Sequence, residues 1–297
     1  MSLQDLLNQA STYLKERNVE DPSLEAGLLL SWVLGKDLGT LYMDSGLSPN
    51  QEQIQLFWAA VERRGHHEPF AYITGECEFL SLSFKVNPHV LIPRADTEIL
   101  AEAALKAMGK GSPYFYQPMF TLPEKDGYRV LDVGTGSGCL AISLAKNVSV
   151  CRVEALDISE QALATAKANG EFHHVSEQIR FIRGDFLGDL SALAPQYDLI
   201  VSNPPYIPAK DVEELMPSVR NYEPHTALAG GDDGLVFYRA LAQKAPSLLA
   251  PHGIMIVECG YDQAYPVQAL FLEKGMETLF LKDLSGINRV VASRRQV

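Results

Sequence analysis

The sequence predicts an α/β protein in which a small helical-bundle domain and a β-hairpin linker precede a doubly wound, mostly parallel sheet of seven strands. From residue 128 onward, short apolar runs alternate with segments of helical periodicity, which is the pattern of a parallel sheet with crossover helices. Before residue 71, apolar residues recur at helical spacing instead. We therefore divide the chain into a helical domain at 1–70, a linker at 71–92 and a larger domain at 93–297.

The first 70 residues predict a bundle of helices. The first helix has one apolar face, made of Leu3, Leu6, Leu7, Ala10 and Leu14. Asp21, as an N-cap before Pro22, predicts the start of a second helix, and Gly35 predicts its end. The expected apolar face of this helix comprises Leu24, Leu28 and Trp32. Residues 48–51 fit a capping box, and the helix after them has an apolar stripe of Ile54, Phe57, Trp58 and Val61.

The next segments differ in character from the bundle. Residues 71–92 alternate between apolar and polar side chains and contain Gly75, which predicts a β-hairpin. A helix is expected from about Asp96 to Met108. Residues 109–127 are rich in glycine, proline and aromatic residues without periodicity, which predicts a loop. This loop is either an insertion with a partner of its own or a surface excursion, and the pattern favours the excursion.

The remaining chain supplies the sheet and its helices. The expected strands are 128–133, 152–156, 179–182, 198–202, 253–258, 278–282 and 288–292. The expected helices between them are 139–146, 160–169, 234–249 and 264–273. The last two strands leave almost no room for a helix between them, so one of them should run antiparallel to the others.

Composition bounds the function. The formal net charge is −12 and the basic residues are scattered, so direct binding of nucleic acid is not expected. The four cysteines form no CxxC pair and no metal-ligand spacing occurs, so we expect reduced thiols and no metal site. The N-terminus lacks a secretory signal, and the longest apolar stretch, residues 27–35, is too short to cross a bilayer. A cytoplasmic protein without a membrane partner is therefore predicted.

A glycine-rich turn follows the first strand of the larger domain. It consists of Gly134, Thr135, Gly136, Ser137 and Gly138. Such a turn lets a ligand approach the backbone and exposes N–H groups at the start of a helix, although a purely structural turn has the same composition. The spacing is G-x-G-x-G, whereas nicotinamide-dependent enzymes use G-x-G-x-x-G. This difference favours the compact amino-acid end of S-adenosylmethionine over a pyrophosphate.

Acidic residues follow the next two strands. Asp157 lies where a carboxylate accepts hydrogen bonds from ribose hydroxyls, and the alternative is a helix cap, a role that Ser159 can fill. After the third strand, Asp185 is expected to meet the adenine amino group and Phe186 to pack on the base. A helix cap and a core phenylalanine are the alternative for this pair.

The most specific motif follows the fourth strand. It is Asn203-Pro204-Pro205-Tyr206. The prolines fix the backbone and leave free carbonyl acceptors, the asparagine side chain adds an acceptor, and the tyrosine adds an aromatic face. Together these groups suit a planar –NH2 group, with a rigid turn and a packed tyrosine as the alternative.

This motif predicts methyl transfer to an amide or amine nitrogen. An amide nitrogen is a poor nucleophile because its lone pair is delocalised into the carbonyl. When both N–H groups are hydrogen-bonded to acceptors, the nitrogen can become tetrahedral and its lone pair can attack the sulfonium methyl. The catalytic residues predicted for this step are Asn203, Pro204 and Tyr206. In-line positioning adds to this effect.

At these residues the chain resembles the HemK/PrmC family of release-factor glutamine methyltransferases. The resemblance extends to the stretches 69–76, 91–94, 97–98, 222–224 and 230–235, and to the helical N-terminal segment. It implies a seven-stranded, Rossmann-like methyltransferase sheet, S-adenosylmethionine as cofactor and S-adenosylhomocysteine as product. Position 186 often carries Trp in this family, and the connection at 109–127 is usually shorter.

The resemblance also implies a substrate, the glutamine of the Gly-Gly-Gln motif of class 1 peptide chain release factors. By this resemblance, the cofactor would be contacted by residues 134–138, Asp157, Phe186 and Asn203. The glutamine would be bound by residues 203–206, and the release factor would be recognised with the help of residues 1–70. The alternative enzyme is an adenine-amino DNA or RNA methyltransferase, which uses the same four-residue motif on a flipped base. A non-catalytic binding protein is the third hypothesis, and the intact motif residues oppose it.

Overall fold

The computed structural model describes residues 2–43, 46–111, 115–193 and 196–295. These residues form two compact units, which we describe separately. The first comprises Met1–Gly75 together with Met216–Tyr222, and the second comprises Glu76–Leu215 together with Glu223–Val297. No helix in the described part of the chain is both long enough and apolar enough to span a membrane.

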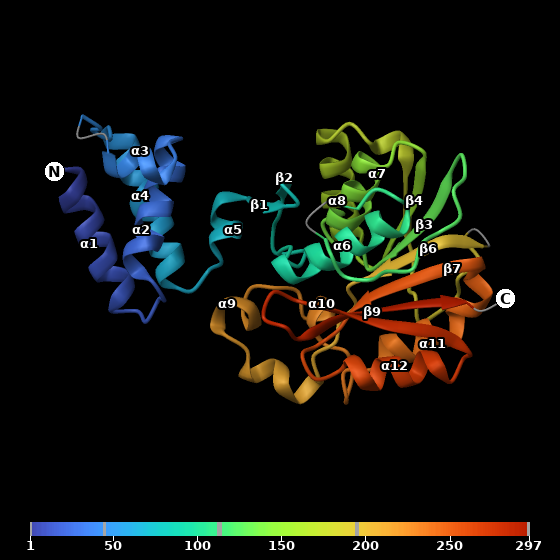
Figure 1. Ribbon diagram of the computed structural model, residues 1–297. Helices are drawn as coiled ribbons and strands as arrows, with labels where there is room; N and C mark the ends of the chain where they lie inside the picture. The colour runs from blue at the N-terminus through green and yellow to red at the C-terminus, as the bar shows by residue number, and fades with distance from the viewer. Residues whose placement is uncertain (1, 44–45, 112–114, 194–195, 296–297) are drawn as a thin grey trace. The chain divides into compact units, whose positions relative to one another are not determined.

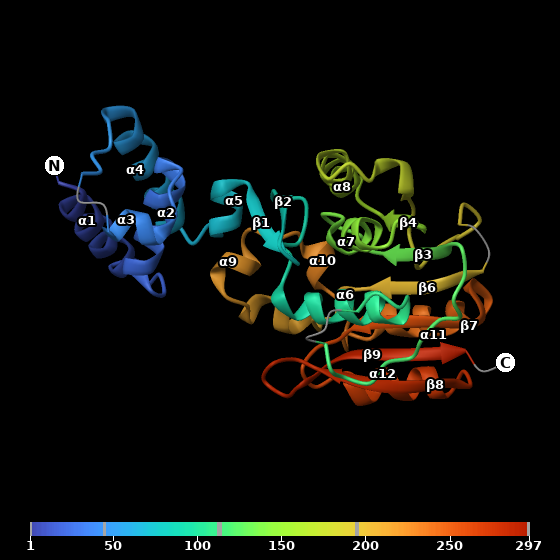
Figure 2. The same cartoon turned by 45° about the horizontal axis from the view of Figure 1, so that its top comes forward.

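The first unit is helical. Its helices are α1 (Leu3–Lys15), α2 (Pro22–Leu34), α3 (Leu38–Met43), α4 (Gln51–Gly65), α5 (Phe70–Thr74) and the short α9 (Pro217–Arg220). In Figures 1 and 2, α1, α2 and α4 lie side by side. Their shared core contains Leu6, Leu14, Leu30 and Phe57, which confirms the apolar faces expected for the first and the last of these three helices.

Two expectations for this unit were wrong. The buried face of α2 is formed by Ala26, Gly27, Leu29, Leu30 and Ser31, whereas Leu24 and Trp32 are exposed. Small residues at 26 and 27 allow close packing on this face, which Leu29 and Leu30 complete. The expected start of α2 is confirmed, since Asp21 occupies the N-cap position and Pro22 the first turn, although the Asp21 backbone is left-handed and its side chain makes no capping hydrogen bond. The capping box of α4 pairs Asn50 with Gln53, two residues later than expected.

The hairpin is shorter than expected. Residues 70–74 form α5, which ends at Gly75 in a left-handed conformation, so the alternating pattern at 71–74 does not mark a strand. The two strands are β1 (Glu76–Phe79) and β2 (Leu82–Lys85), which pair antiparallel. Phe79 and Phe84 are fully buried in the core of the second unit and anchor the hairpin there.

The second unit contains the expected sheet. Its strands are β3 (Tyr128–Val133), β4 (Cys151–Asp157), β5 (Ile179–Arg183), β6 (Tyr197–Ser202), β7 (Leu249–Glu258), β8 (Met276–Lys282) and β9 (Asn288–Arg295). They are ordered β5-β4-β3-β6-β7-β9-β8. β9 pairs antiparallel with both of its neighbours, β7 and β8, whereas the other strand pairs described in this sheet are parallel. The doubly wound fold and the single antiparallel strand are therefore confirmed.

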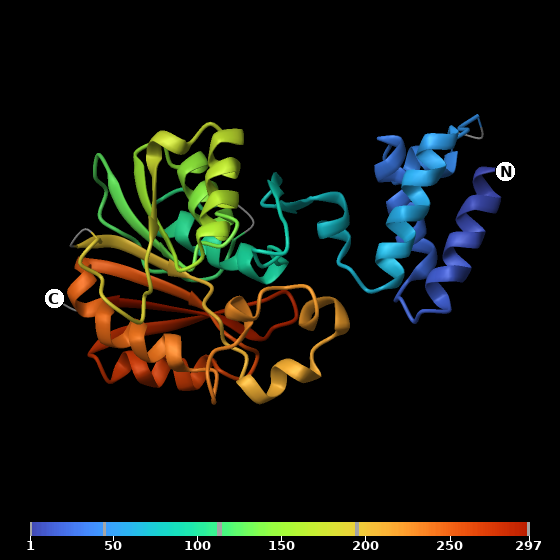
Figure 3. The same ribbon diagram turned by 180° about the vertical axis from the view of Figure 1, so that it is seen from behind.

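Helices cover both faces of this sheet. The longer ones are α6 (Ala95–Ala107), α7 (Cys139–Asn147), α8 (Glu160–Phe172), α11 (Val236–Leu248) and α12 (Ala264–Leu272). The short turns are η1 (Ser176–Gln178), η2 (Ala209–Glu214) and α10 (His225–Leu228). Seen from behind in Figure 3, the yellow-green α8 and the orange α11 lie on opposite sides of the sheet.

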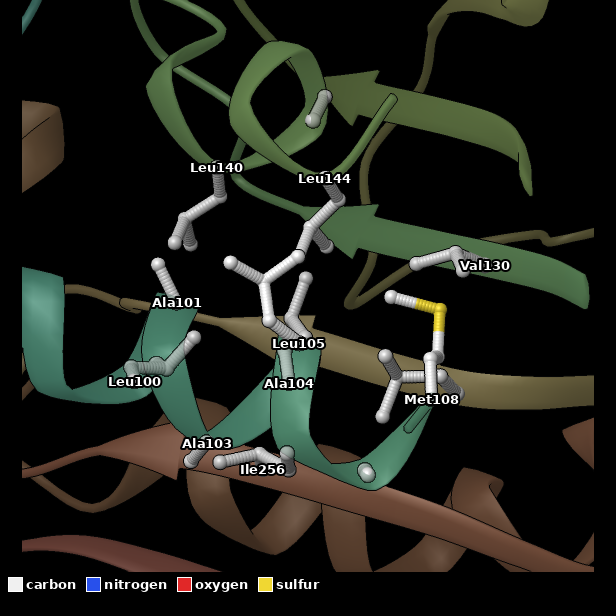
Figure 4. Close-up of a cluster of buried hydrophobic side chains, with 14 of the residues drawn as sticks. Leu100, Ala101, Ala103, Ala104, Leu105, Met108, Val130, Leu140, Leu144 and Ile256 are labelled. Atoms are coloured by element: carbon white, nitrogen blue, oxygen red, sulfur yellow. The ribbon is translucent and has the colours of Figure 1, made fainter. Parts of the chain in front are cut away.

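Two apolar cores result, one on each face. Figure 4 shows the first, where Ala101 and Leu105 of α6 lie beside Leu140 and Leu144 of α7, and Ala103 lies beside Ile256 of β7. Burying a leucine of this size contributes roughly 1.5–3 kcal/mol. The second core joins α11 and α12 to the opposite face of the strands.

The segment before β3 is not a mere surface excursion. Phe115 and Phe120 are buried in the first core. Lys106 Nζ donates to the carbonyl of Gln117 at 2.7 Å, and the Gln117 side chain exchanges two hydrogen bonds with the backbone of Lys282. Phe115 and Phe120 are spaced without helical or strand periodicity, so the local sequence does not reveal that they are buried.

Candidate functional site

A cavity opens at the carboxyl ends of β3, β4, β5 and β6, beside the switch point where the strand order reverses between β3 and β6. Its empty volume is about 1050 Å³, part of which is open to solvent. The predicted site residues that line it are Gly134, Thr135, Gly136, Ser137, Asp157, Asp185, Phe186, Asn203, Pro204 and Pro205. Gly138 and Tyr206 were predicted with them but do not line this cavity.

The glycines of the turn differ in what surrounds them. Gly134, Gly136 and Gly138 all have positive φ, between 55° and 82°, which disfavours any residue with a Cβ. A Cβ on Gly134 or Gly136 would meet no atom within 4 Å, so both leave free space. At Gly138 it would lie 2.9 Å from Ile142 and 3.1 Å from the Cβ of Ala166. Gly138 thus permits helix packing, and the first two glycines leave room for a ligand.

Asp157 holds the glycine turn in place. Its Oδ2 accepts a hydrogen bond from Gly136 N at 2.9 Å, and its Oδ1 accepts one from Ser159 N at 2.8 Å. Ser159 is the N-cap of α8, since its hydroxyl oxygen accepts from Ala162 N at 3.1 Å. Burial raises the pKa of the Asp157 carboxyl. The capping role therefore falls to Ser159, and Asp157 presents a half-buried carboxylate to the cavity.

A second acid, which the sequence analysis missed, lies behind the same turn. Asp132 is fully buried at the end of β3, where its Oδ2 accepts from the Thr135 hydroxyl at 2.6 Å and from Ala141 N at 3.2 Å. Its Oδ1 has no hydrogen-bond partner among the described residues. Burial raises the pKa of Asp132 to about 7. An acid within the apolar run at 130–133 was the available signal in the sequence.

Asp132 should give stability a pH dependence. Because its pKa rises from 3.8 in an unfolded chain to about 7, the folded state keeps a proton that the unfolded chain has released. The free energy of unfolding contributed by this group therefore falls as pH rises from about 4 to 7. We expect urea melts of Asp132→Asn to show a shallower pH slope in that window than the wild type. An identical slope would contradict the assignment.

Asp185 and Phe186 follow β5. Asp185 is exposed, and its Oδ1 accepts from Leu187 N at 2.8 Å. The Phe186 ring is buried in the second core, and the Nζ of Lys244 lies 5.3 Å from the ring centroid. Both residues border the cavity, while much of the Phe186 side chain serves the core.

The motif at 203–206 is fixed by its neighbours. Ser202 Oγ donates to Val133 O at 2.8 Å, which ties the end of β6 to the end of β3. Asn203 Nδ2 donates to Thr97 Oγ1 at 3.0 Å, and no donor in the described part of the chain hydrogen-bonds the Asn203 side-chain oxygen. The Tyr206 ring packs on the second core, and burial raises the pKa of its phenol. The side-chain oxygen of Asn203 is thus the available acceptor.

A second glycine turn, residues 230–234, lies directly behind this motif. A Cβ on Gly230 would lie 2.7 Å from Pro205 O, and one on Gly234 would lie 2.3 Å from Tyr206 O. Gln263 Nε2 also donates to Tyr206 O, at 2.8 Å. The backbone of the motif is therefore held by contacts that leave no space for another side chain.

An ion pair joins two stretches that border the cavity. The Arg94 guanidinium donates to the buried carboxylate of Glu223, which also accepts from Ile92 N at 3.3 Å. Burial raises the pKa of Glu223. Arg94 and Pro224 line the cavity, so this pair fixes its rim. Arg94 and Glu223 both lie in stretches that carry the family resemblance. They are 129 residues apart, so no local sequence pattern reveals that they form an ion pair.

Among the residues described, no group of three or more His, Cys, Asp or Glu side chains is arranged to hold a metal ion.

Solved structures with related folds are methyltransferases. A methyltransferase from Pyrococcus furiosus is 16% identical, with a TM-score of 0.51, covering 74% of this chain and 91% of that one. The hMettl16 catalytic domain in complex with the MAT2A 3'UTR hairpin 6 is 14% identical, with a TM-score of 0.55, covering 83% and 82%. At these identities the likeness concerns the fold alone.

The family models match in two parts. The PrmC N-terminal domain matches residues 5–75, and the methyltransferase small domain matches residues 107–219. The first match covers the helical segment, and the second contains the glycine turn, Asp157 and the motif at 203–206.

Full-length relatives agree with both matches. The release factor glutamine methyltransferase of Geobacter sulfurreducens is 40% identical to this chain, and the match covers 99% of this chain and 96% of the relative. That of Moorella thermoacetica is 38% identical, and the match covers 100% of this chain and 99% of the relative. The one from Chlorobaculum tepidum is 36% identical, covering 99% and 98%. The resemblance seen in the motifs is thereby confirmed, and the chain belongs to the release factor glutamine methyltransferase family.

Proposed function

We propose that this protein transfers a methyl group from S-adenosylmethionine to the side-chain nitrogen of the glutamine in the Gly-Gly-Gln motif of class 1 release factors, leaving S-adenosylhomocysteine. The observation that carries the proposal is the Asn203 amide, which is held through its nitrogen by Thr97 and whose oxygen accepts no hydrogen bond from the described residues. This amide borders the same cavity as the glycine turn and Asp157. An adenine amine is the alternative methyl acceptor, but the full-length relatives described above are named release factor glutamine methyltransferases.

The residues of the cavity fit the cofactor. Gly134 and Gly136 leave open space beside the backbone, which suits the amino-acid end of the cofactor, and Asp157 offers a carboxylate to ribose hydroxyls. Asp185 would meet the adenine amino group and Phe186 would pack on the base, with Thr135, Ser137 and Gly138 completing the turn. When bound, S-adenosylmethionine supplies an electrophilic methyl group on a sulfonium.

Residues 203–206 would prepare the glutamine nitrogen. The Asn203 side-chain oxygen and the Pro204 carbonyl would each accept one N–H of the substrate amide. These bonds strengthen as the nitrogen leaves conjugation with its carbonyl, so they stabilise the transition state more than the ground state. Pro205 would keep this backbone rigid, and Tyr206 would support the glutamine from its place on the second core. No general base is required before attack, and the surplus proton leaves from the methylated nitrogen to water.

The rest of the chain would serve recognition. Residues 1–70 would recognise the release factor as a substrate-binding domain, residues 71–92 would act as linker, and residues 93–297 would bind the cofactor and perform the transfer. The net charge of −12 suits a protein substrate better than a nucleic acid. This activity belongs in the cytoplasm, where release factors act, and requires no membrane partner.

Methyl transfer from labelled cofactor tests the proposal. Wild-type protein should label an intact class 1 release factor, and mass spectrometry of its peptides should place the methyl group on the glutamine of Gly-Gly-Gln. A release factor with alanine at that glutamine is the control and should stay unlabelled. Label on an adenine-containing oligonucleotide, with none on the release factor, would overturn the proposal.

Asp157→Ala should weaken cofactor binding more than it slows transfer. The loss of a carboxylate that accepts hydroxyl hydrogen bonds should raise the Kd for S-adenosylmethionine roughly tenfold or more, with a smaller change in kcat at saturating cofactor. Calorimetry measures the first and single-turnover kinetics the second. Asp189→Ala is the matched control, because that exposed aspartate accepts hydrogen bonds from Ser191 outside the cavity. An unchanged Kd would exclude Asp157 from the cofactor site.

A further inference from the structure

The Asn203 amide is the end of a chain of hydrogen bonds that leads into the protein interior. Asn203 Nδ2 donates to Thr97 Oγ1 at 3.0 Å, and the same hydroxyl donates to Glu258 Oε2 at 2.6 Å. Thr97 and Glu258 are each only 2% exposed. These three residues come from the loop after β6, the first turn of α6 and the last position of β7.

The backbone around the buried end of this chain is fixed. Glu258 pairs with Val290 of β9, and its carbonyl accepts from the Tyr238 hydroxyl at 2.8 Å. Thr97 lies within α6, whose apolar side is packed in the first core. The carboxylate and the hydroxyl therefore hold their positions independently of any ligand in the cavity.

The direction of the chain follows from the chemistry of its members. A carboxylate is an acceptor only, so the single hydroxyl proton of Thr97 goes to Glu258. The hydroxyl oxygen then has only lone pairs to offer Asn203, and it can pair with the –NH2 end of the amide but not with its oxygen. The oxygen of Asn203 must consequently be the end that is left for the cavity.

We propose that Glu258 and Thr97 are positioning residues that set which end of the Asn203 amide meets the substrate nitrogen. This inference rests on the proposed function, in which Asn203 accepts an N–H bond. If the Asn203 amide were rotated by 180°, its N–H groups would face the N–H groups of the substrate amide. The hydrogen bond between Asn203 and the substrate would then be replaced by electrostatic repulsion. The carboxylate thus acts on the reaction through two hydrogen bonds, without touching substrate or cofactor.

Glu258→Leu tests the direction of the chain. Leucine is close to glutamate in size but has no acceptor, so the Thr97 hydroxyl loses its partner and can donate to the oxygen of Asn203 instead, which leaves the –NH2 end of Asn203 for the cavity. We expect kcat on the release factor to fall roughly tenfold or more, while the Kd for cofactor stays within about twofold. Burial raises the pKa of Glu258 to about 7, so assays at about pH 8.5 keep the wild-type carboxylate charged.

Thr97→Val and Thr97→Ser test the middle of the chain. Valine keeps the shape and removes the hydroxyl, so kcat should again fall roughly tenfold, whereas serine should recover most of it. Thr165→Val is the matched control. Thr165 is also buried, and its hydroxyl accepts from Asn87 Nδ2 at 2.9 Å and donates to Gln161 O at 3.2 Å, but it does not line the cavity. That variant should keep wild-type kcat.

A double-mutant cycle separates positioning from a structural role. If Thr97 acts through Asn203, adding Thr97→Val to Asn203→Ala should cost no further activity in single-turnover assays. An equal loss in both backgrounds would overturn the inference, as would full kcat in Thr97→Val or Glu258→Leu. Wild-type protein that transfers no methyl group to release factor would instead overturn the proposed function, and this inference with it.

Discussion

Replacing Asn203 with alanine should lower kcat for methyl transfer by about 100- to 1000-fold, the effect of removing a donor or acceptor aimed at a transition state. The side-chain oxygen of Asn203 has no donor among the described residues, so its loss leaves the substrate nitrogen without one of its two acceptors. The cofactor would still contact the glycine turn and Asp157, so its Kd should change by only a few fold. Single-turnover assays with saturating cofactor measure the first quantity, and calorimetry measures the second.

Asn147→Ala is the control for this variant. Asn147 is exposed at the end of α7, where its Nδ2 donates to Ser143 O at 2.8 Å, and it does not line the cavity. We expect that variant to retain wild-type kcat. Near-normal turnover in Asn203→Ala would remove Asn203 from the catalytic group and with it the proposed grip on the glutamine.

Gly234→Ala should abolish most activity without any change to a catalytic side chain. The added Cβ would lie 2.3 Å from Tyr206 O and 2.5 Å from Gln263 Nε2, closer than atoms can approach. The motif at 203–206 must then shift, and the hydrogen bond from Gln263 to Tyr206 O must lengthen or break. A misplacement of about 1 Å at a reacting group costs on the order of 100-fold in rate.

Gly286→Ala separates this displacement from backbone strain. Gly234 has φ 73° and Gly286 has φ 83°, so both variants carry the strain of a left-handed alanine, but the Cβ on Gly286 would meet no atom within 4 Å. Melting temperatures should fall in both variants, while kcat should fall only in Gly234→Ala. A parallel loss of kcat in both would attribute the effect to stability instead.

The sequence predicted the elements of the second unit well, because buried parallel strands and crossover helices leave strong local patterns. It was less successful where packing depends on small residues. The buried face of α2 contains Ala26 and Gly27, and a search for large apolar side chains selected Leu24 and Trp32, which are exposed. Residues 71–74 alternate like a strand, but Gly75 in a left-handed conformation ends a short helix there.

The sequence predicts those residues of the candidate site that directly follow the carboxyl end of a strand. The glycine turn, Asp157 and Asn203 do so, and parallel strands bring their carboxyl ends to one edge. Thr97, Glu223 and Glu258 were missed because their partners lie 106, 131 and 161 residues away, so only the topology brings them together. Contacts at such separations leave no periodicity in the sequence.

The position of β9 in the sheet has a consequence for biosynthesis. β9 lies between β7 and β8, although it follows both in the chain. Until residues 288–295 have left the ribosome, one edge of β7 has no partner and β8 has none at all. Glu258 stands at the end of that open edge. The nascent protein therefore exposes an unpaired strand late in synthesis, the kind of surface on which chains associate wrongly and chaperones act.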